Sequence, residues 1–191
     1  VVGAGAIGGW LAARLALAGE TVSVVARGGT LENIRSRGIE LRSSGQSELA
    51  PVRACASADE LDPQDIVLLT VKAPALPAIA PSLRPLLHAK TLVLSAGNGL
   101  PWWYFLGSGI PCSGLRLRSV DPHGVMENSL PLRHVLKAIG HIIPKIIKAE
   151  FVVRAVSYIG VIGLFARNRT PVVKPRVAVR GCGLMCGVVD A

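Results

Sequence analysis

The first nine residues, Val1-Val2-Gly3-Ala4-Gly5-Ala6-Ile7-Gly8-Gly9, contain the pattern G-x-G-x-x-G at Gly3, Gly5 and Gly8. In this pattern the first glycine allows a tight turn after a strand, and the second lets the backbone approach a pyrophosphate. The third lets a helix pack closely against a sheet. This loop constrains the fold most strongly, because a side chain at any of the three positions would push the phosphates away.

The residues after the loop complete a strand, loop, helix and strand unit. Residues 10–18 are rich in helix-forming side chains, and Gly19 is placed to end that helix. The apolar stretch 21–26 predicts the next strand. The loop therefore precedes the positive end of a helix, which favours a phosphate. The alternative is a glycine-rich packing turn. We favour a dinucleotide site, with its cofactor-binding residues being Gly3, Ala4, Gly5, Ala6, Ile7 and Gly8.

Length and composition limit the class of protein. A chain of 191 residues has room for one full domain and part of another, and its 50% hydrophobic content can supply a sizeable core. The first 26 residues are apolar, but Arg14, Glu20 and the glycine spacing argue against a signal peptide or membrane span. We expect a cytoplasmic protein whose first strand starts before Val1. The cysteines and histidines show no spacing typical of a metal site, so no metal is expected.

Arg27 directly follows the predicted strand 21–26, at the position where many NAD-binding sites carry an acidic residue. No Asp or Glu lies between Thr21 and Leu31. A guanidinium there can instead bind the 2′-phosphate of NADP. The alternative is an ordinary solvated arginine. The sequence thus favours NADP over NAD as the cofactor.

Two apolar runs predict buried parallel strands, at residues 65–72 and 91–96. Lys72 ends the first strand and Asn98 follows the second. Ligands of open parallel sheets bind at the carboxyl ends of the strands, so both side chains are candidates for the site. The alternatives are a solvent-exposed lysine and an Asn-Gly turn.

The remaining patterns predict several further elements. Residues 30–38 read as a short helix capped by Thr30 and stopped by Gly38. Residues 39–41 and 52–54 alternate around a Ser-Ser-Gly turn, which suggests a hairpin. We also expect a helical turn at 57–61, a helix at 76–87 that its prolines limit or bend, and an aromatic cluster at 102–105 that packs a helix.

With these residues together, the chain resembles the ketopantoate reductase family, also called 2-dehydropantoate 2-reductase. The matching pieces are the glycine loop, Arg27, Val71-Lys72-Ala73 and Asn98-Gly99-Leu100. The resemblance implies an enzyme that reduces 2-dehydropantoate to pantoate with NADPH, in the synthesis of pantothenate and coenzyme A. It further implies that the loop and Arg27 hold the cofactor, and that Lys72 and Asn98 contact both the cofactor near its nicotinamide and the 2-keto acid substrate.

The chain departs from the family in its second half. The family's proton donor is a lysine in a helical second domain, and Lys137, Lys145, Lys148 and Lys174 lie in different contexts. We therefore assign no catalytic residue and expect this chain to be inactive by itself. Two other functions stay open: a catalytically silent NADP-binding module, and a reductase of another 2-keto acid.

The basic charge gathers near the end of the chain. Residues 1–130 carry 11 Lys and Arg against 10 Asp and Glu, whereas the last 61 residues carry 10 against 2. This basic tail has no aromatic residues between its charges, so we expect neither a nucleic acid nor a membrane as a partner. The tail is also too short to form a complete second domain. We favour a truncated or out-of-frame terminus. The predicted architecture is α/β, a Rossmann-like doubly wound, mostly parallel sheet over residues 1–150, followed by an irregular, poorly ordered tail at 151–191. The sequence does not indicate an oligomeric state.

Overall fold

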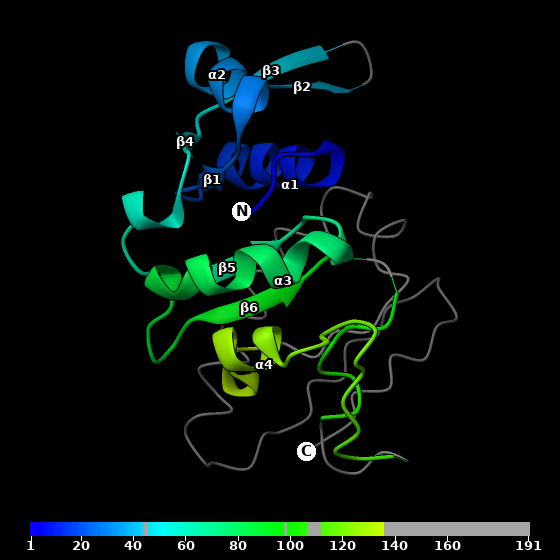
Figure 1. The fold of residues 1–191 in the computed structure, drawn as a ribbon. Coiled ribbons are helices and arrows are strands. Elements are labelled where there is room, and N and C mark those ends of the chain that lie inside the picture. Colours follow the sequence, from blue (N-terminus) through cyan, green and yellow to red (C-terminus); the bar gives the residue numbers. More distant parts are fainter. Residues whose placement is uncertain (44–45, 98, 107–111, 136–191) are drawn as a thin grey trace, which may run out of the picture.

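The computed structural model describes residues 1–43, 46–97, 99–106 and 112–135, which are coloured in Figure 1. Helices and strands alternate along most of this part of the chain, as the sequence predicts for an α/β fold. The strands are β1 (Ser23–Val25), β2 (Ile39–Ser43), β3 (Gln46–Ala50), β4 (Arg53–Cys55), β5 (Ile66–Leu69) and β6 (Leu92–Ser95). The α-helices are α1 (Ala6–Leu17), α2 (Gly28–Arg37), α3 (Leu76–Ile79) and α4 (Val125–Ser129). Short 3-10 turns occupy Ala58–Glu60, Ala73–Ala75, Ala80–Leu86 and Leu132–His134.

The central sheet is parallel, and Val2 lies in its middle. Val2 forms parallel bridges with Val25 of β1 on one side and with Leu69 of β5 on the other. Beyond these, β1 pairs with β4 and β5 pairs with β6. The order across the sheet is therefore β4, β1, Val2, β5 and β6, and the direction of winding reverses at Val2. This order confirms the predicted doubly wound, Rossmann-like sheet.

Alternate residues of the strands face two separate cores. In β5, Val67 and Leu69 belong to one apolar cluster and Leu68 belongs to the other, as the two-residue period of a strand requires. The cluster on the Leu68 side includes buried residues of α1, α2 and the β2–β3 hairpin. The cluster on the Val67 side includes residues of α3, α4 and the turn Ala80–Leu86. In Figure 1 the hairpin and α2 lie at one end of the molecule and α4 at the other.

The end of α1 confirms the role predicted for Gly19. This glycine has a φ of +94°, and its N–H donates to the carbonyl of Ala16 at 3.0 Å. The N–H of Glu20 donates to the carbonyl of Leu15 at 3.1 Å. Together these two bonds form the Schellman arrangement that closes a helix, and the left-handed backbone at its centre favours glycine.

A hairpin forms where one was predicted, but its second strand is not the predicted one. Residues 39–43 do form one strand, but β2 pairs in antiparallel register with β3 at 46–50 instead of with residues 52–54. Residues 53–55 form β4, which pairs in parallel with β1 and so belongs to the central sheet. The alternating pattern near Val52 marks a strand correctly, but a pattern of this kind carries no information about the partner strand.

The structure also refines two of the predicted helices. The helix after β1 starts at Gly28 with Arg27 as its N-cap, so Thr30 lies in the first turn and is not the cap; the stop at Gly38, with a φ of +73°, is confirmed. The stretch 76–87 is α-helical only to Ile79 and continues as a 3-10 turn, because its prolines interrupt the helical hydrogen bonds. The aromatic cluster at 102–105 packs against helices as predicted, since Trp102 and Trp103 are buried in the same apolar cluster as Leu76 of α3 and Met126 of α4.

The expectations for Asn98 and for the tail after residue 135 lie outside the described residues. Within the described ranges, no helix has the length and apolarity that a transmembrane span needs.

Candidate coenzyme site

The glycine loop leaves the sheet at its centre, between Val2 and α1. Gly3 has a φ of +96°, which an L side chain rarely adopts, and a Cβ there would lie 2.6 Å from Cγ1 of Val71. A Cβ on Gly8 would lie 1.9 Å from the carbonyl oxygen of Gly3. A Cβ on Gly5, in contrast, would meet no atom within 4 Å. The packing of the protein itself thus requires glycine at positions 3 and 8. Glycine at position 5 instead leaves open the space on the solvent side of the loop.

The loop leads into the positive end of α1. Gly5 is the N-cap of this helix, and the helix has neither a side-chain cap nor an acidic residue in its first turn. The N–H groups of Ala6, Ile7 and Gly8 therefore have no partner within the helix, and the first helical bond runs from the N–H of Gly9 to the carbonyl of Gly5 at 2.7 Å. Gly5, Ala6 and Ile7 are exposed at this point. Free N–H groups and the dipole of a 12-residue helix make this a suitable place for a phosphate group.

Arg27 lies at the carboxyl end of β1, where α2 begins. Its side chain is exposed, and among the described residues it takes part in none of the observed ion pairs. Gly28, with a φ of +55°, and Gly29 follow it and have open space where a Cβ would be. The guanidinium is therefore available to an anion beside the first turn of α2.

Lys72 follows β5 on the same edge of the sheet as the glycine loop. The link is direct, because Thr70 pairs with Val2 and the backbone nitrogen of Val71 would lie 3.3 Å from a Cβ on Gly3. Lys72 is exposed and is the N-cap of the turn Ala73–Ala75. The structure thus brings the glycine loop, Arg27 and Lys72 to the carboxyl ends of neighbouring strands, as predicted.

Asn98 lies outside the described residues, so its predicted place in the site stays a prediction. The strand before it does reach the same edge, since the N–H of Ala96 donates to the carbonyl of Leu69 at 2.9 Å. The lysines considered as proton donors, Lys137 and those after it, also fall outside the described part of the chain.

Thr70 makes a contact with the loop that the sequence analysis did not predict. Its hydroxyl oxygen lies 2.6 Å from the carbonyl oxygen of Gly3 and 2.9 Å from that of Val2. The available signal was a single hydroxyl in an otherwise apolar strand, at the residue that follows the buried Leu69.

Carboxyl groups with shifted pKa values lie elsewhere on the surface. The Arg116 guanidinium, 2.7 Å away, lowers the pKa of Glu127. Backbone N–H groups of Ser57 and Ala56 lower the pKa of Glu60. Both interactions hold loops in place, and neither residue belongs to the glycine loop or to the ends of β1 and β5.

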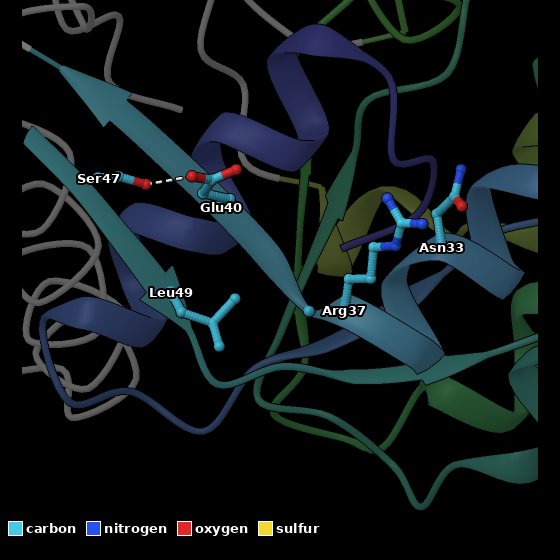
Figure 2. Close-up of a pocket in the computed structure, with 6 residues that line it drawn as sticks. Asn33, Arg37, Glu40, Ser47 and Leu49 are labelled. Atoms are coloured by element: carbon cyan, nitrogen blue, oxygen red, sulfur yellow. Dashed lines mark hydrogen bonds between the residues drawn. The ribbon is translucent and has the colours of Figure 1, made fainter. Parts of the chain in front are cut away.

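A groove of about 450 Å³ lies beside α2 and the β2–β3 hairpin (Figure 2), and its lining includes no residue of the glycine loop. The side chains of Asn33, Arg37, Glu40, Ser47 and Leu49 line it, and Ser47 donates a hydrogen bond to Glu40. A second hollow of about 150 Å³ lies at the opposite, amino edge of the sheet, next to Val1 and Gln64. We place the candidate site at the glycine loop instead, because free N–H groups, a cation and conformationally required glycines meet there.

Known proteins resemble this chain in sequence and in structure. The family model of ketopantoate reductase PanE/ApbA matches residues 1–101. A protein named 2-dehydropantoate 2-reductase from Mesorhizobium japonicum is 46% identical over 140 residues, which are 73% of this chain and 43% of that protein. The chain therefore spans less than half the length of this relative.

Solved structures show the same fold. A protein from Ralstonia solanacearum whose crystal structure is named for a ketopantoate reductase matches with a TM-score of 0.67 and 49% identity, over 70% of this chain and 41% of that one. A D-mandelate dehydrogenase solved with NADH and anilino(oxo)acetate matches with a TM-score of 0.53 and 18% identity, over 70% and 38%. At that identity the second likeness concerns the fold alone.

Proposed function

This chain belongs to the ketopantoate reductase family, and on that premise we propose that it forms the coenzyme-binding half of an NADPH-dependent 2-dehydropantoate 2-reductase. The reaction reduces the ketone of a 2-keto acid to an alcohol and yields pantoate, a precursor of pantothenate and coenzyme A. We propose a cytoplasmic setting for it, and a coenzyme domain that extends over residues 1–150.

The glycine loop carries this proposal. Gly3 and Gly8 are closed in by their own surroundings, while the space outside Gly5 is open and faces unpaired N–H groups at the start of α1. This is the arrangement that a pyrophosphate needs, because its oxygens accept hydrogen bonds from backbone N–H groups at close range. We propose that Gly3, Ala4, Gly5, Ala6, Ile7 and Gly8 form this cradle.

The preference for NADP rests on Arg27. Its exposed guanidinium lies at the end of β1, where it can bind a 2′-phosphate with two parallel hydrogen bonds. No carboxylate between Thr21 and Leu31 competes for the ribose hydroxyls or repels the phosphate. Both features favour the phosphorylated coenzyme.

Lys72 supplies a positive charge at the reacting end of the site. When bound, NADPH supplies a hydride to the ketone carbon of the substrate, and negative charge develops on the ketone oxygen. A lysine ammonium close to this oxygen stabilises that charge. We propose that Lys72 binds near the nicotinamide and the keto acid, together with Asn98. We assign no proton donor.

Coenzyme titration tests the proposal, with binding followed through the fluorescence of the reduced nicotinamide. We expect the purified chain to bind NADPH at least tenfold more tightly than NADH. Arg27→Ala is expected to weaken NADPH binding about tenfold, the loss of one charged hydrogen-bonded contact, while NADH binding stays unchanged. Arg37→Ala removes an arginine from the far end of the same helix and serves as the control. Equal affinity for both coenzymes would remove the role given to Arg27.

A turnover assay separates the reductase from its alternatives. Oxidation of NADPH in the presence of 2-dehydropantoate would show activity in this chain, whereas tight binding without turnover matches a coenzyme-binding half that is inactive alone or a silent module. Oxidation with a different 2-keto acid would indicate a related reductase.

A further inference from the structure

The hydroxyl of Thr70 joins the end of β5 to the first turn of the glycine loop. Its oxygen lies 2.6 Å from the carbonyl oxygen of Gly3 and 2.9 Å from that of Val2. The Val2 carbonyl already accepts from the backbone N–H of Thr70 at 3.0 Å. In the described part of the chain, the hydroxyl is the donor observed for the Gly3 carbonyl. The single hydroxyl proton of Thr70 therefore forms its hydrogen bond mainly with the Gly3 carbonyl.

The Gly3 carbonyl lies in a confined place beneath the start of α1. A Cβ on Gly8 would lie 1.9 Å from this oxygen and 2.4 Å from Oγ1 of Thr70. Loop, hydroxyl and helix thus meet at one point. A half-buried carbonyl here that lost its donor would be destabilised, because little room is left for a water molecule to replace the hydroxyl.

The direction of this carbonyl also sets the direction of the next N–H group. The described peptide bonds are all trans, and in a trans peptide the C=O and N–H groups point in opposite directions. With the Gly3 carbonyl held toward Thr70, the N–H of Ala4 points away from the end of β5. A reversed peptide would instead turn a carbonyl oxygen toward the space outside the loop, where it would repel a phosphate.

We propose that Thr70 is a positioning residue for the coenzyme, which acts through the Gly3 carbonyl. Its hydroxyl holds the Gly3–Ala4 peptide in the orientation that presents N–H groups to the pyrophosphate, and it fixes the distance between the loop and α1. This inference rests on the proposed function, since it concerns how the same loop binds NADPH.

Three variants test the proposal by titration with NADPH. Thr70→Val keeps the shape but removes the hydroxyl, and we expect the Kd for NADPH to rise about tenfold. Thr70→Ser keeps the hydroxyl and is expected to bind within about twofold of the unmodified chain. Thr91→Val is the matched control. The Thr91 hydroxyl likewise donates to a backbone carbonyl, that of Gln64 at 2.6 Å, but Thr91 is fully buried and lies at the opposite edge of the sheet.

The outcomes separate a positioning role from a structural one. Thermal unfolding should show a loss of stability for both Thr70→Val and Thr91→Val, with only the former weakening NADPH binding. The proposal fails if Thr70→Val binds NADPH normally, or if Thr91→Val weakens binding equally. If Thr70→Val does not fold, Thr70→Ala replaces it, with Thr70→Ser as the rescue.

A second measurement does not depend on the coenzyme. Amide hydrogen exchange of residues 1–9 in the free chain should be faster in Thr70→Val than in Thr70→Ser, and unchanged in Thr91→Val. If the unmodified chain binds no NADPH, the proposed function is wrong, and the exchange rates still decide whether Thr70 orders the loop. Equal exchange in all variants would overturn the positioning role.

Discussion

Replacing Gly8 by alanine gives the most direct test of the loop. The added Cβ would lie 1.9 Å from the Gly3 carbonyl oxygen and 2.4 Å from the Thr70 hydroxyl, whereas ordinary contact begins at 3.4 Å. The start of α1 must therefore retreat by about 1.5 Å, which equals the rise of one helical residue. Overpacking of this kind lowers the free energy of unfolding by about 1–3 kcal/mol.

The same displacement weakens coenzyme binding. A shift of about 1.5 Å takes the first N–H groups of α1 out of hydrogen-bonding range of a pyrophosphate. If two hydrogen bonds to charged oxygens are lost, at about 1.5 kcal/mol each, the Kd for NADPH rises roughly a hundredfold. Urea unfolding followed by circular dichroism measures the stability, and nicotinamide fluorescence measures the binding.

Substitutions at two neighbouring glycines separate the effect on stability from the effect on coenzyme binding. Gly5→Ala meets no atom within 4 Å in the free chain, so stability is expected to stay nearly unchanged while NADPH binding falls, because the new methyl group occupies the space outside the loop. Gly9→Ala meets only the Ala4 carbonyl, at 3.9 Å, and should bind normally with equal or greater stability. Normal NADPH binding by Gly8→Ala or Gly5→Ala would refute the reasoning, as would a large loss of binding in Gly9→Ala.

Two further predictions concern stability outside the site. Glu60 closes a capping box with Ser57, and its pKa lies below the ordinary value for a glutamate because backbone N–H groups of Ser57 and Ala56 bind the carboxylate. Its contribution is thus fully present above the pKa of an unfolded glutamate and is lost as the pH falls through the lower folded pKa. Glu60→Ala should unfold earlier than the unmodified chain at pH 7, and a difference that does not shrink as the pH is lowered through the acid range would contradict this. Asp121 accepts hydrogen bonds from the N–H groups of Met126 and Glu127, in the first turn of α4, at 3.1 and 3.2 Å. Asp121→Ala should therefore lower the free energy of unfolding by about 1–2 kcal/mol, measured in urea. An unchanged unfolding midpoint would show that these hydrogen bonds do not stabilise the chain.

The sequence predicted those parts of the site that depend on local chemistry. The spacing of Gly3 and Gly8 predicted that both positions need glycine, and in the structure a Cβ at either position would meet another atom at 2.6 Å or less. Lys72 lies near the loop because parallel strands present their carboxyl ends at one edge. The start of α2 was less predictable. Thr30 is a good cap in isolation, but Gly28 with its positive φ begins the helix earlier, directly at Arg27.

Contacts between distant residues account for what was missed. The pairing of β4 with β1 joins residues about 30 positions apart, and the three-residue strand Arg53–Cys55 has no local pattern that names its partner. The bond between Thr70 and Gly3 spans 67 positions. It depends on which way one hydroxyl points at the end of β5, and that direction is set by tertiary packing.

The narrow centre of the sheet has a mechanical consequence. Among the described residues, the Val1–Gly3 segment joins the two halves there: Val2 makes two backbone hydrogen bonds to the Leu68–Thr70 segment, while Val1 and Gly3 make three main-chain hydrogen bonds to Ser23 and Val25. Arg27 follows β1 on one side of Val2, and Lys72 follows β5 on the other side. A dinucleotide bound between these two residues would therefore link the two halves of the sheet. Its binding free energy then opposes separation of the halves, and saturating coenzyme should make unfolding sharper as well as later.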